Sequence, residues 1–170
     1  MNTTLSGVKA IGPDDGAEGF LGSIGVRFLI DGAEAAQRFS LVEHPMSPRA
    51  LAAPLHLHTR EDEYSYVLEG EVGVQIGDEV TVAKPGDLVF KPRGVPHAFW
   101  NAGDAPARVL EIISPAPFAR YFEELEPLFG GPTGPDFPAI AALQARYGLS
   151  MDLDSIGMLV EREGLDPAGP

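Results

Sequence analysis

Three histidines and one glutamate occur at spacings that suit a metal site. His56 and His58 are separated by one residue, Glu63 follows shortly after, and His97 lies further along the chain. Because side chains alternate between the two faces of a strand, His56 and His58 point the same way if their segment is a strand. Three imidazoles and one carboxylate suit a divalent transition metal such as Fe, Mn, Ni, Co or Zn. The spacing predicts one metal ion held by these four side chains.

The alternative is a group of hydrogen-bonded polar residues in the core. That arrangement requires a partner for every ring nitrogen and for both carboxylate oxygens. Four potential ligands at mutually consistent places favour the metal. Glu63 is also the predicted catalytic residue, because a carboxylate that can leave a metal can take a proton from a bound enol or hydroxyl. The chain has no cysteine, which excludes thiol nucleophiles, zinc fingers and iron–sulfur ligation.

Short runs of β-branched and aromatic residues, separated by Gly, Asp and Pro, dominate the middle of the chain. Such runs at regular spacing favour an all-β sandwich or barrel over alternating strands and helices. Glu63 begins the run after the two histidines, so it is expected on a neighbouring strand. The runs are Ile24–Ile30, Arg38–Glu43, Pro54–Thr59, Glu63–Leu68, Glu71–Ile76, Glu79–Ala83, Asp87–Lys91, Pro96–Asn101 and Arg108–Ser114.

Three regions follow from this pattern. Residues 1–22 are predicted to be an N-terminal arm or short edge strands, residues 23–114 the β-barrel, and residues 115–170 a helical extension. Apolar residues at helical spacing and flanking glycines predict the helices of this extension. We expect them to pack on the outer sheet or to bridge protomers, and the alternative is a lid over the barrel mouth. The predicted helices are Phe118–Phe129, Ala139–Tyr147 and Ile156–Glu163.

Strand parity suggests which side chains line a substrate pocket near the metal. Ser65 and Val67 lie two and four residues after Glu63, so they are expected on the same face of the strand as Glu63. Phe99 lies two residues after His97 and is expected on the same face as His97. Phe90 fits either a dry core or an apolar pocket, and we place it in the pocket with the other three.

The remaining aromatic residues and the fourth histidine have other expected places. Tyr64 and Tyr66 are expected on the strand face opposite to that of Glu63, where they would pack at a sheet or subunit contact. Trp100 is expected to point outward, under the extension or into an interface. His44 falls at the end of a strand before a proline and is expected to be partly exposed, although a fifth ligand is the alternative.

Charge and hydropathy narrow the possible partners. The formal net charge is −13, which repels nucleic acid and anionic lipid. No stretch approaches the roughly 18 apolar residues needed to cross a bilayer, and the first ten residues lack the pattern of a secretory signal. We therefore expect a cytoplasmic protein that binds a small molecule, and neither a nucleic acid nor a membrane.

Two segments resemble the two sequence motifs of the cupin family. The first is His56-x-His58, four residues, Glu63, six residues, Gly70; the second is Gly86, five residues, Pro92-x-Gly94, two residues, His97, three residues, Asn101. One departure is Ala50, where the family has a glycine that shapes a turn. The resemblance implies a double-stranded β-helix (jelly-roll) barrel that holds a metal through the four side chains above, with a short C-terminal helical appendage in this chain.

The single-barrel layout, the turn after His58 and the helical extension look like small bacterial quercetin 2,3-dioxygenase-like cupins. This resemblance implies a dioxygenase-type oxidoreductase that uses O₂ on an aromatic or enolic, oxygen-chelating small molecule, with Glu63 assisting deprotonation. The alternatives are a non-oxidative metal-dependent isomerase, decarboxylase or lyase, and a cupin that binds a small molecule without turnover. Because dimers are usual in this family, the resemblance also implies a homodimer.

Overall fold

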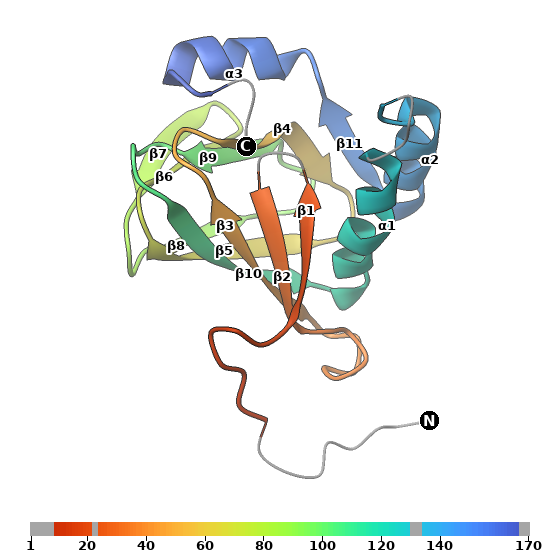
Figure 1. The fold of residues 1–170 in the computed structure, drawn as a ribbon. Helices are drawn as coiled ribbons and strands as arrows, with labels where there is room; N and C mark the ends of the chain where they lie inside the picture. Colours follow the sequence, from red (N-terminus) through yellow and green to blue (C-terminus); the bar gives the residue numbers. More distant parts are fainter. Residues whose placement is uncertain (1–8, 22–23, 130–133, 167–170) are drawn as a thin grey trace.

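Two antiparallel β-sheets face each other in a computed structural model that describes residues 9–21, 24–129 and 134–166 (Figure 1). The six-stranded sheet contains, in spatial order, β1 (Ala17–Leu21), β2 (Ile24–Ile30), β3 (Ser40–Met46), β10 (Ala107–Ser114), β5 (Asp62–Glu69) and β8 (Leu88–Lys91). The five-stranded sheet contains β11 (Leu149–Asp152), β4 (Leu51–His58), β9 (His97–Asn101), β6 (Val72–Ile76) and β7 (Glu79–Ala83).

The alternation of side chains explains why these segments form a closed sandwich. Along β10, every second residue is buried, so one face of the strand points into the core and the other outward. An apolar core of side chains such as Val67, Val74, Phe99 and Val109 fills the space between the sheets. The all-β jelly-roll prediction is therefore confirmed.

The predicted strands agree closely with the observed ones, with one strand missed. Ile24–Ile30 and Glu79–Ala83 have the predicted bounds. β11 was not predicted, because a run of four residues between two helices is too short to show the alternation of apolar and polar residues that marks a strand. β11 extends the five-stranded sheet by pairing with β4. In the region expected to be an arm, β1 pairs with β2 at the sheet edge. Residues 1–8 and 22–23 of this region lie outside the described residues.

Short helices follow the last strand of the barrel, as predicted. They are the 3₁₀ turn η1 (Ala116–Phe118), α1 (Ala119–Phe129), α2 (Phe137–Tyr147) and α3 (Ser155–Glu163). The Asp136 carboxylate accepts a hydrogen bond from the Ala139 N–H at 3.1 Å and so caps α2. Gly148 ends the helix in the left-handed conformation, at φ 70°, which glycine adopts without strain.

The helices cover two different parts of the sandwich (Figure 1). α1 and α2 lie side by side, and their apolar faces share a buried cluster with Val26 and Val42 of β2 and β3. α3 lies across β4, and its Leu159 shares a buried cluster with Trp100 of β9. This second contact explains why every residue of β9 is buried: the core covers one face of the strand and α3 the other.

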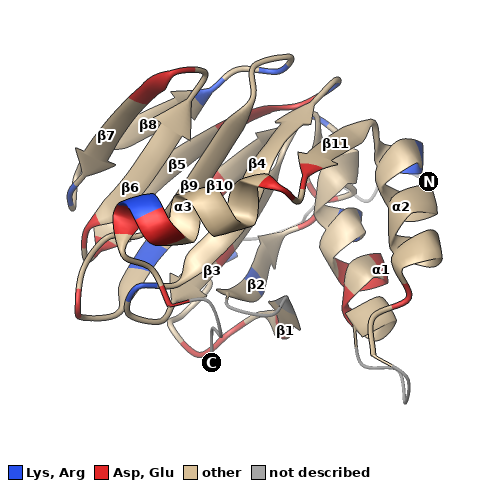
Figure 2. Cartoon of the chain, turned by 90° about the horizontal axis from the view of Figure 1, so that it is seen from above, with Lys and Arg blue, Asp and Glu red and all other residues tan. Residues whose placement is uncertain are grey.

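Charged residues occur on strands, loops and helices. Figure 2 shows acidic residues on α1, on α3 and in several connections between strands. Among the described residues, no helix is long and apolar enough to span a membrane.

Candidate metal centre

The four predicted ligands converge inside the sandwich. His56, His58, Glu63 and His97 are all buried, and each offers a ligand atom within 4.8 Å of the others. His56 on β4 lies directly opposite His97 on β9. Glu63, however, belongs to β5, which pairs with β8 and β10 in the other sheet. The expectation that Glu63 stands on a strand next to the histidines was wrong: the turn after His58 crosses between the two sheets, so the carboxylate faces the imidazoles across the sandwich.

Backbone carbonyls select the tautomer of two of the histidines. His56 Nδ1 lies 2.8 Å from the Pro54 carbonyl oxygen, and His97 Nδ1 lies 3.1 Å from the Val95 carbonyl oxygen. Because a carbonyl oxygen can only accept, each Nδ1 carries the hydrogen and donates it. The neutral rings therefore keep the lone pair on Nε2, as a metal ligand requires.

Unpaired nitrogens and burial both fit a metal ion. Among the described residues, His58 has no hydrogen-bond partner at either ring nitrogen, and His97 has none at Nε2, although these atoms are sealed from solvent. Buried nitrogens without partners are costly unless something else binds them. Burial lowers the pKa of His56 and His97, so both rings are neutral at physiological pH. This cluster can bind a divalent transition metal.

Glu63 is held ionised by its neighbours. Its Oε2 lies 3.1 Å from Lys91 Nζ and 3.3 Å from His97 Nε2, and its Oε1 lies 3.5 Å from His58 Nε2. Burial raises the pKa of Glu63, but the positive charge of Lys91 and the contacts with His58 and His97 outweigh burial and hold the pKa well below its ordinary value. The carboxylate is therefore available as a ligand or as a base.

A buried chain of polar contacts continues behind Glu63. Lys91 Nζ is also 3.1 Å from Glu111 Oε1, and Glu111 Oε2 accepts a hydrogen bond from Ser65 Oγ at 2.6 Å. Burial lowers the pKa of Lys91, but Glu111 and Glu63 overcome this effect and raise it. Burial raises the pKa of Glu111 to about 7, against the opposing charge of Lys91.

The strand register brings this chain together. Glu63 lies opposite Lys91 in the β5–β8 pair, and Ser65 lies opposite Glu111 in the β10–β5 pair. The sequence analysis did not identify Lys91 or Glu111. A signal was present, because Lys91 is the one charged residue of β8 and Glu111 lies between the apolar residues Leu110 and Ile112, but their proximity depends on pairing that the sequence does not specify.

Glu61 is a further buried carboxylate beside the cluster. It is 3% exposed, and its Oε2 lies 3.7 Å from His58 Nδ1. Histidine ligands commonly direct their second nitrogen to a carboxylate, which fixes the ring orientation. Glu61 is therefore placed to orient His58.

A cavity of about 690 Å³ opens onto the cluster. His56, His58 and Glu63 contribute to its wall, and helices α1 and α2 contribute most of the opposite, apolar side. Helices α1 and α2 line the cavity, which agrees with the alternative of a lid rather than with packing on the outer sheet. α3 packs on β4, and its Ile156 and Val160 also reach the cavity. The bridging of protomers stays a prediction. The apolar helix residues that line the cavity are Phe118, Tyr121, Phe122, Leu125, Phe129, Phe137, Ile140, Ala141, Ile156 and Val160.

The four residues predicted to line a pocket have different places. Phe99 lines the cavity. Ser65 and Val67 point into the sandwich as expected but do not line the cavity: Ser65 binds Glu111, and Val67 belongs to the apolar core. Phe90 was assigned wrongly: its side chain is 48% exposed, and its ring stacks on Tyr64 at 4.9 Å on the outer face of the sheet.

His44 differs from expectation, whereas Trp100 agrees with one of its two stated alternatives. His44 was expected to be partly exposed, but it is 2% exposed and lines the cavity, because α1 covers this end of β3. Trp100 points outward from the barrel and is buried under α3, as one of the two alternatives stated, so it is not available for a subunit contact. Tyr66 remains exposed, and the homodimer stays a prediction.

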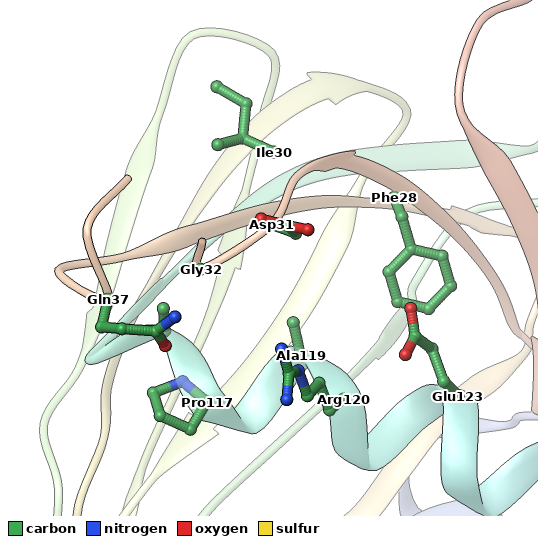
Figure 3. Close-up of a pocket in the computed structure, with 10 residues that line it drawn as sticks. Phe28, Ile30, Asp31, Gly32, Gln37, Pro117, Ala119, Arg120 and Glu123 are labelled. Carbon is green, nitrogen blue, oxygen red and sulfur yellow. The ribbon is translucent and has the colours of Figure 1, made fainter. Parts of the chain in front are cut away.

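A second, smaller cavity lies between the β2–β3 connection and the start of α1 (Figure 3). Its volume is about 330 Å³, and none of its lining residues belongs to the metal cluster or to the larger cavity. Figure 3 shows Gln37, Asp31, Arg120 and Glu123 around it. The described residues there include no histidine, so this cavity does not reproduce the chemistry of the main site.

Known proteins resemble this chain mainly through the barrel. Residues 43–113 match the cupin domain family. The tetracenomycin polyketide synthase protein TcmJ of Streptomyces glaucescens is 37% identical over 60 residues, which are 35% of this chain and 40% of TcmJ. The oxidoreductase iacF of Pestalotiopsis fici is 46% identical over 48 residues, which are 28% of this chain and 24% of iacF. The matched segments span less than half of either relative.

A solved structure extends the similarity beyond the two motifs. The polyketide cyclase RemF from Streptomyces resistomycificus is 32% identical, with a TM-score of 0.55, and the match covers 63% of this chain and 79% of RemF. The family match, this structural similarity and the buried cluster of three histidines and one glutamate agree. The chain belongs to the cupin superfamily.

Proposed function

We propose that this protein is a metal-dependent enzyme that acts on an enolisable, oxygen-chelating small molecule with a largely apolar body, of the aromatic or polyketide type. One observation carries the proposal: a single cavity combines the ligand cluster with a wall of aromatic and aliphatic side chains. Such a cavity holds an apolar body by burial and directs its few oxygens to one end. Its volume of about 690 Å³ suits a molecule of two or three fused or linked rings.

A divalent metal in the cluster would supply Lewis acidity toward carbonyl or enol oxygens. The protein's own residues supply the rest. Glu63, ionised and close to the cluster, accepts a proton from the carbon next to a carbonyl. Lys91 stabilises the carboxylate form of Glu63 from behind, and the helices exclude water from the reacting chain.

Cyclisation of a polyketide-like chain is the first candidate reaction. It is supported by the similarity to RemF, a polyketide cyclase, and to TcmJ, a polyketide synthase protein. In an intramolecular aldol condensation, a carbon loses a proton and bonds to a carbonyl carbon, the carbonyl oxygen gains a proton, and water leaves. No oxidant is consumed, so this reaction needs no O₂.

Dioxygenation of an enolic or flavonol-type substrate is the second candidate. It is supported by the similarity to the oxidoreductase iacF and by the quercetinase-like features of the sequence. The same deprotonation by Glu63 would precede it, but O₂ would be consumed and both oxygen atoms would enter the product.

The dependence of product formation on O₂ distinguishes the two reactions. The metal-loaded protein is given 1-phenyl-1,3,5-hexanetrione, whose C6–C1 condensation with loss of water yields 3,5-dihydroxybiphenyl, and separately 3-hydroxyflavone. We expect the biphenyl to form at equal rates with and without O₂. Stoichiometric O₂ uptake with ring cleavage of the flavonol would instead identify a dioxygenase.

The control variants separate turnover from background. His97→Asn should abolish product formation, because it removes a ligand, whereas Phe90→Leu on the outer face should not. Binding of both probes without any product, across Zn, Fe, Mn, Ni and Co, would reject the enzyme proposal and leave a binding protein.

A further inference from the structure

His44 is a histidine of the main cavity that does not belong to the metal cluster. It lies on β3, is 2% exposed and contributes to the cavity wall. Its ring packs against two aromatic neighbours of the same wall, tilted against Phe99 at 6.2 Å and edge-on to Phe122 at 5.4 Å. These two contacts and the hydrogen bond to Gly25 together restrict the ring orientation.

The hydrogen bond at one nitrogen decides the character of the other. His44 Nδ1 lies 3.0 Å from the Gly25 carbonyl oxygen, so Nδ1 carries the hydrogen and donates it. Nε2 of the neutral ring then has only a lone pair. It has no hydrogen-bond partner among the described residues, and it is not among the side-chain atoms that the protein seals from solvent.

Burial keeps the ring in this acceptor form. It lowers the pKa of His44 to about 4, so the imidazole is neutral at physiological pH and Nε2 does not become a donor. The cavity thus presents a fixed acceptor in a mostly apolar wall. A ketone or carboxylate oxygen, which can only accept a hydrogen bond, would face the lone pair of His44 Nε2 and form no bond. A hydroxyl group would donate a hydrogen bond to that nitrogen.

We propose that His44 is a second substrate-binding residue, which accepts at Nε2 a hydrogen bond from a phenolic or enolic hydroxyl group of the bound molecule. The inference rests on the proposed function only in taking the cavity as the substrate site. It specifies that the substrate carries a hydroxyl group in addition to the oxygens directed to the metal. A buried acceptor rejects a molecule that lacks its donor, because the acceptor is then left unpaired.

Three naphthalenes of nearly equal size test this inference without any turnover. They are 1-naphthol, which donates a hydrogen bond; 1-methylnaphthalene, which neither donates nor accepts; and 1-methoxynaphthalene, which only accepts. Their dissociation constants are measured by calorimetry on the full chain, with Zn²⁺ and without metal. We expect 1-naphthol to bind about tenfold more tightly than the other two in both preparations.

Variants then test whether the preference for 1-naphthol depends on His44. His44→Phe keeps an aromatic ring and removes the acceptor, so the three constants should agree within about twofold. Gln144→Leu is the matched control, because Gln144 is another polar residue of the same wall, and it should retain the preference for 1-naphthol. Nitrogen NMR of the unsubstituted protein with labelled histidine is independent of how the variants fold: the Nε2 resonance of His44 should shift with 1-naphthol and not with 1-methylnaphthalene.

The proposal would be overturned by equal binding of the three probes, by a preference that persists in His44→Phe, by an Nε2 resonance that does not respond to 1-naphthol, or by the absence of binding at millimolar concentration. Failure of the triketone or flavonol to react leaves these measurements unaffected, because none of them requires catalysis.

Discussion

Lys91 and Glu63 lie directly opposite each other on β8 and β5, with Lys91 Nζ 3.1 Å from Glu63 Oε2. Lys91 lies at the same distance from Glu111, so one buried cation serves two buried carboxylates. Glu63 consequently has a compensating charge even before a metal binds. This pairing makes the metal site part of a larger charged network between the sheets.

Removal of Lys91 should leave two carboxylates buried without a cation. We expect Lys91→Met to lower the free energy of unfolding of the metal-free protein by about 3 kcal/mol, because breaking a buried ion pair on one side leaves an uncompensated charge. Adding Glu111→Gln to this variant should recover part of the loss. Urea denaturation measures both.

Lys84→Met is the control for that measurement. Lys84 pairs with Glu71 on the surface at 3.6 Å, with both side chains largely exposed, and its loss should change the stability by less than about 1 kcal/mol. Equal losses of unfolding free energy in Lys91→Met and Lys84→Met would show that the buried ion pairs of Lys91 stabilise the protein no more than a surface ion pair does.

Loss of one histidine ligand should remove the metal. We expect His97→Asn to lower the metal content, measured by elemental analysis, from about one ion per chain to near zero, because first-row metals at such sites require most of their ligands. His44→Asn, which changes a buried histidine outside the cluster, should keep the ion. Treatment of the unsubstituted protein with a chelator should lower its melting temperature. A metal-free His44→Asn would contradict the assignment of the ligands.

Glu61 should affect metal affinity through His58. Glu61→Gln keeps the size of the side chain but removes the negative charge 3.7 Å from His58 Nδ1, so we expect roughly tenfold weaker metal binding. Competition with a chromogenic chelator measures the affinity, and the absorption of bound Co²⁺ reports on the ligand geometry. Glu69→Gln, an exposed change on β5, should have no effect. An unchanged affinity in Glu61→Gln would mean that packing alone orients His58.

Acid should destabilise the metal-free protein partly through His44. Its native pKa of about 4 lies below the ordinary value of 6.5, so the unfolded chain takes up a proton between these pH values while the native protein does not. Stability is therefore lost as the pH falls from 6.5 toward 4. We expect the difference in unfolding free energy between pH 7.5 and 4.5 to be about 2 to 3 kcal/mol smaller in His44→Phe than in the unsubstituted protein. Denaturant titrations at the two pH values measure it, and identical differences would exclude a neutral, buried His44.

The strands and helices could be predicted because their signals are local. Strand parity put His56 and His58 on one face of β4, and Gly148 and Gly164 marked the ends of α2 and α3. Parity also explains why Phe90 was assigned wrongly to the pocket. Phe90 has the same parity as Leu88, and both are exposed, whereas the alternate residues Val89 and Lys91 point inward. The strand was predicted, but which of its faces is buried was not.

The identity of the four candidate ligands, the all-β class and the positions of the helices were determined by the sequence itself, since they depend on spacing within short segments. The jelly-roll class followed from the resemblance to the two cupin motifs. Only the tertiary structure decided that Glu63 faces the histidines from the opposite sheet, that Lys91 and Glu111 stand behind it, and that α1 closes the cavity over His44. The physical reason is that these contacts join strands and helices distant in the sequence. Such pairings are chosen by the burial of the whole sandwich and not by the residues next to them in the chain.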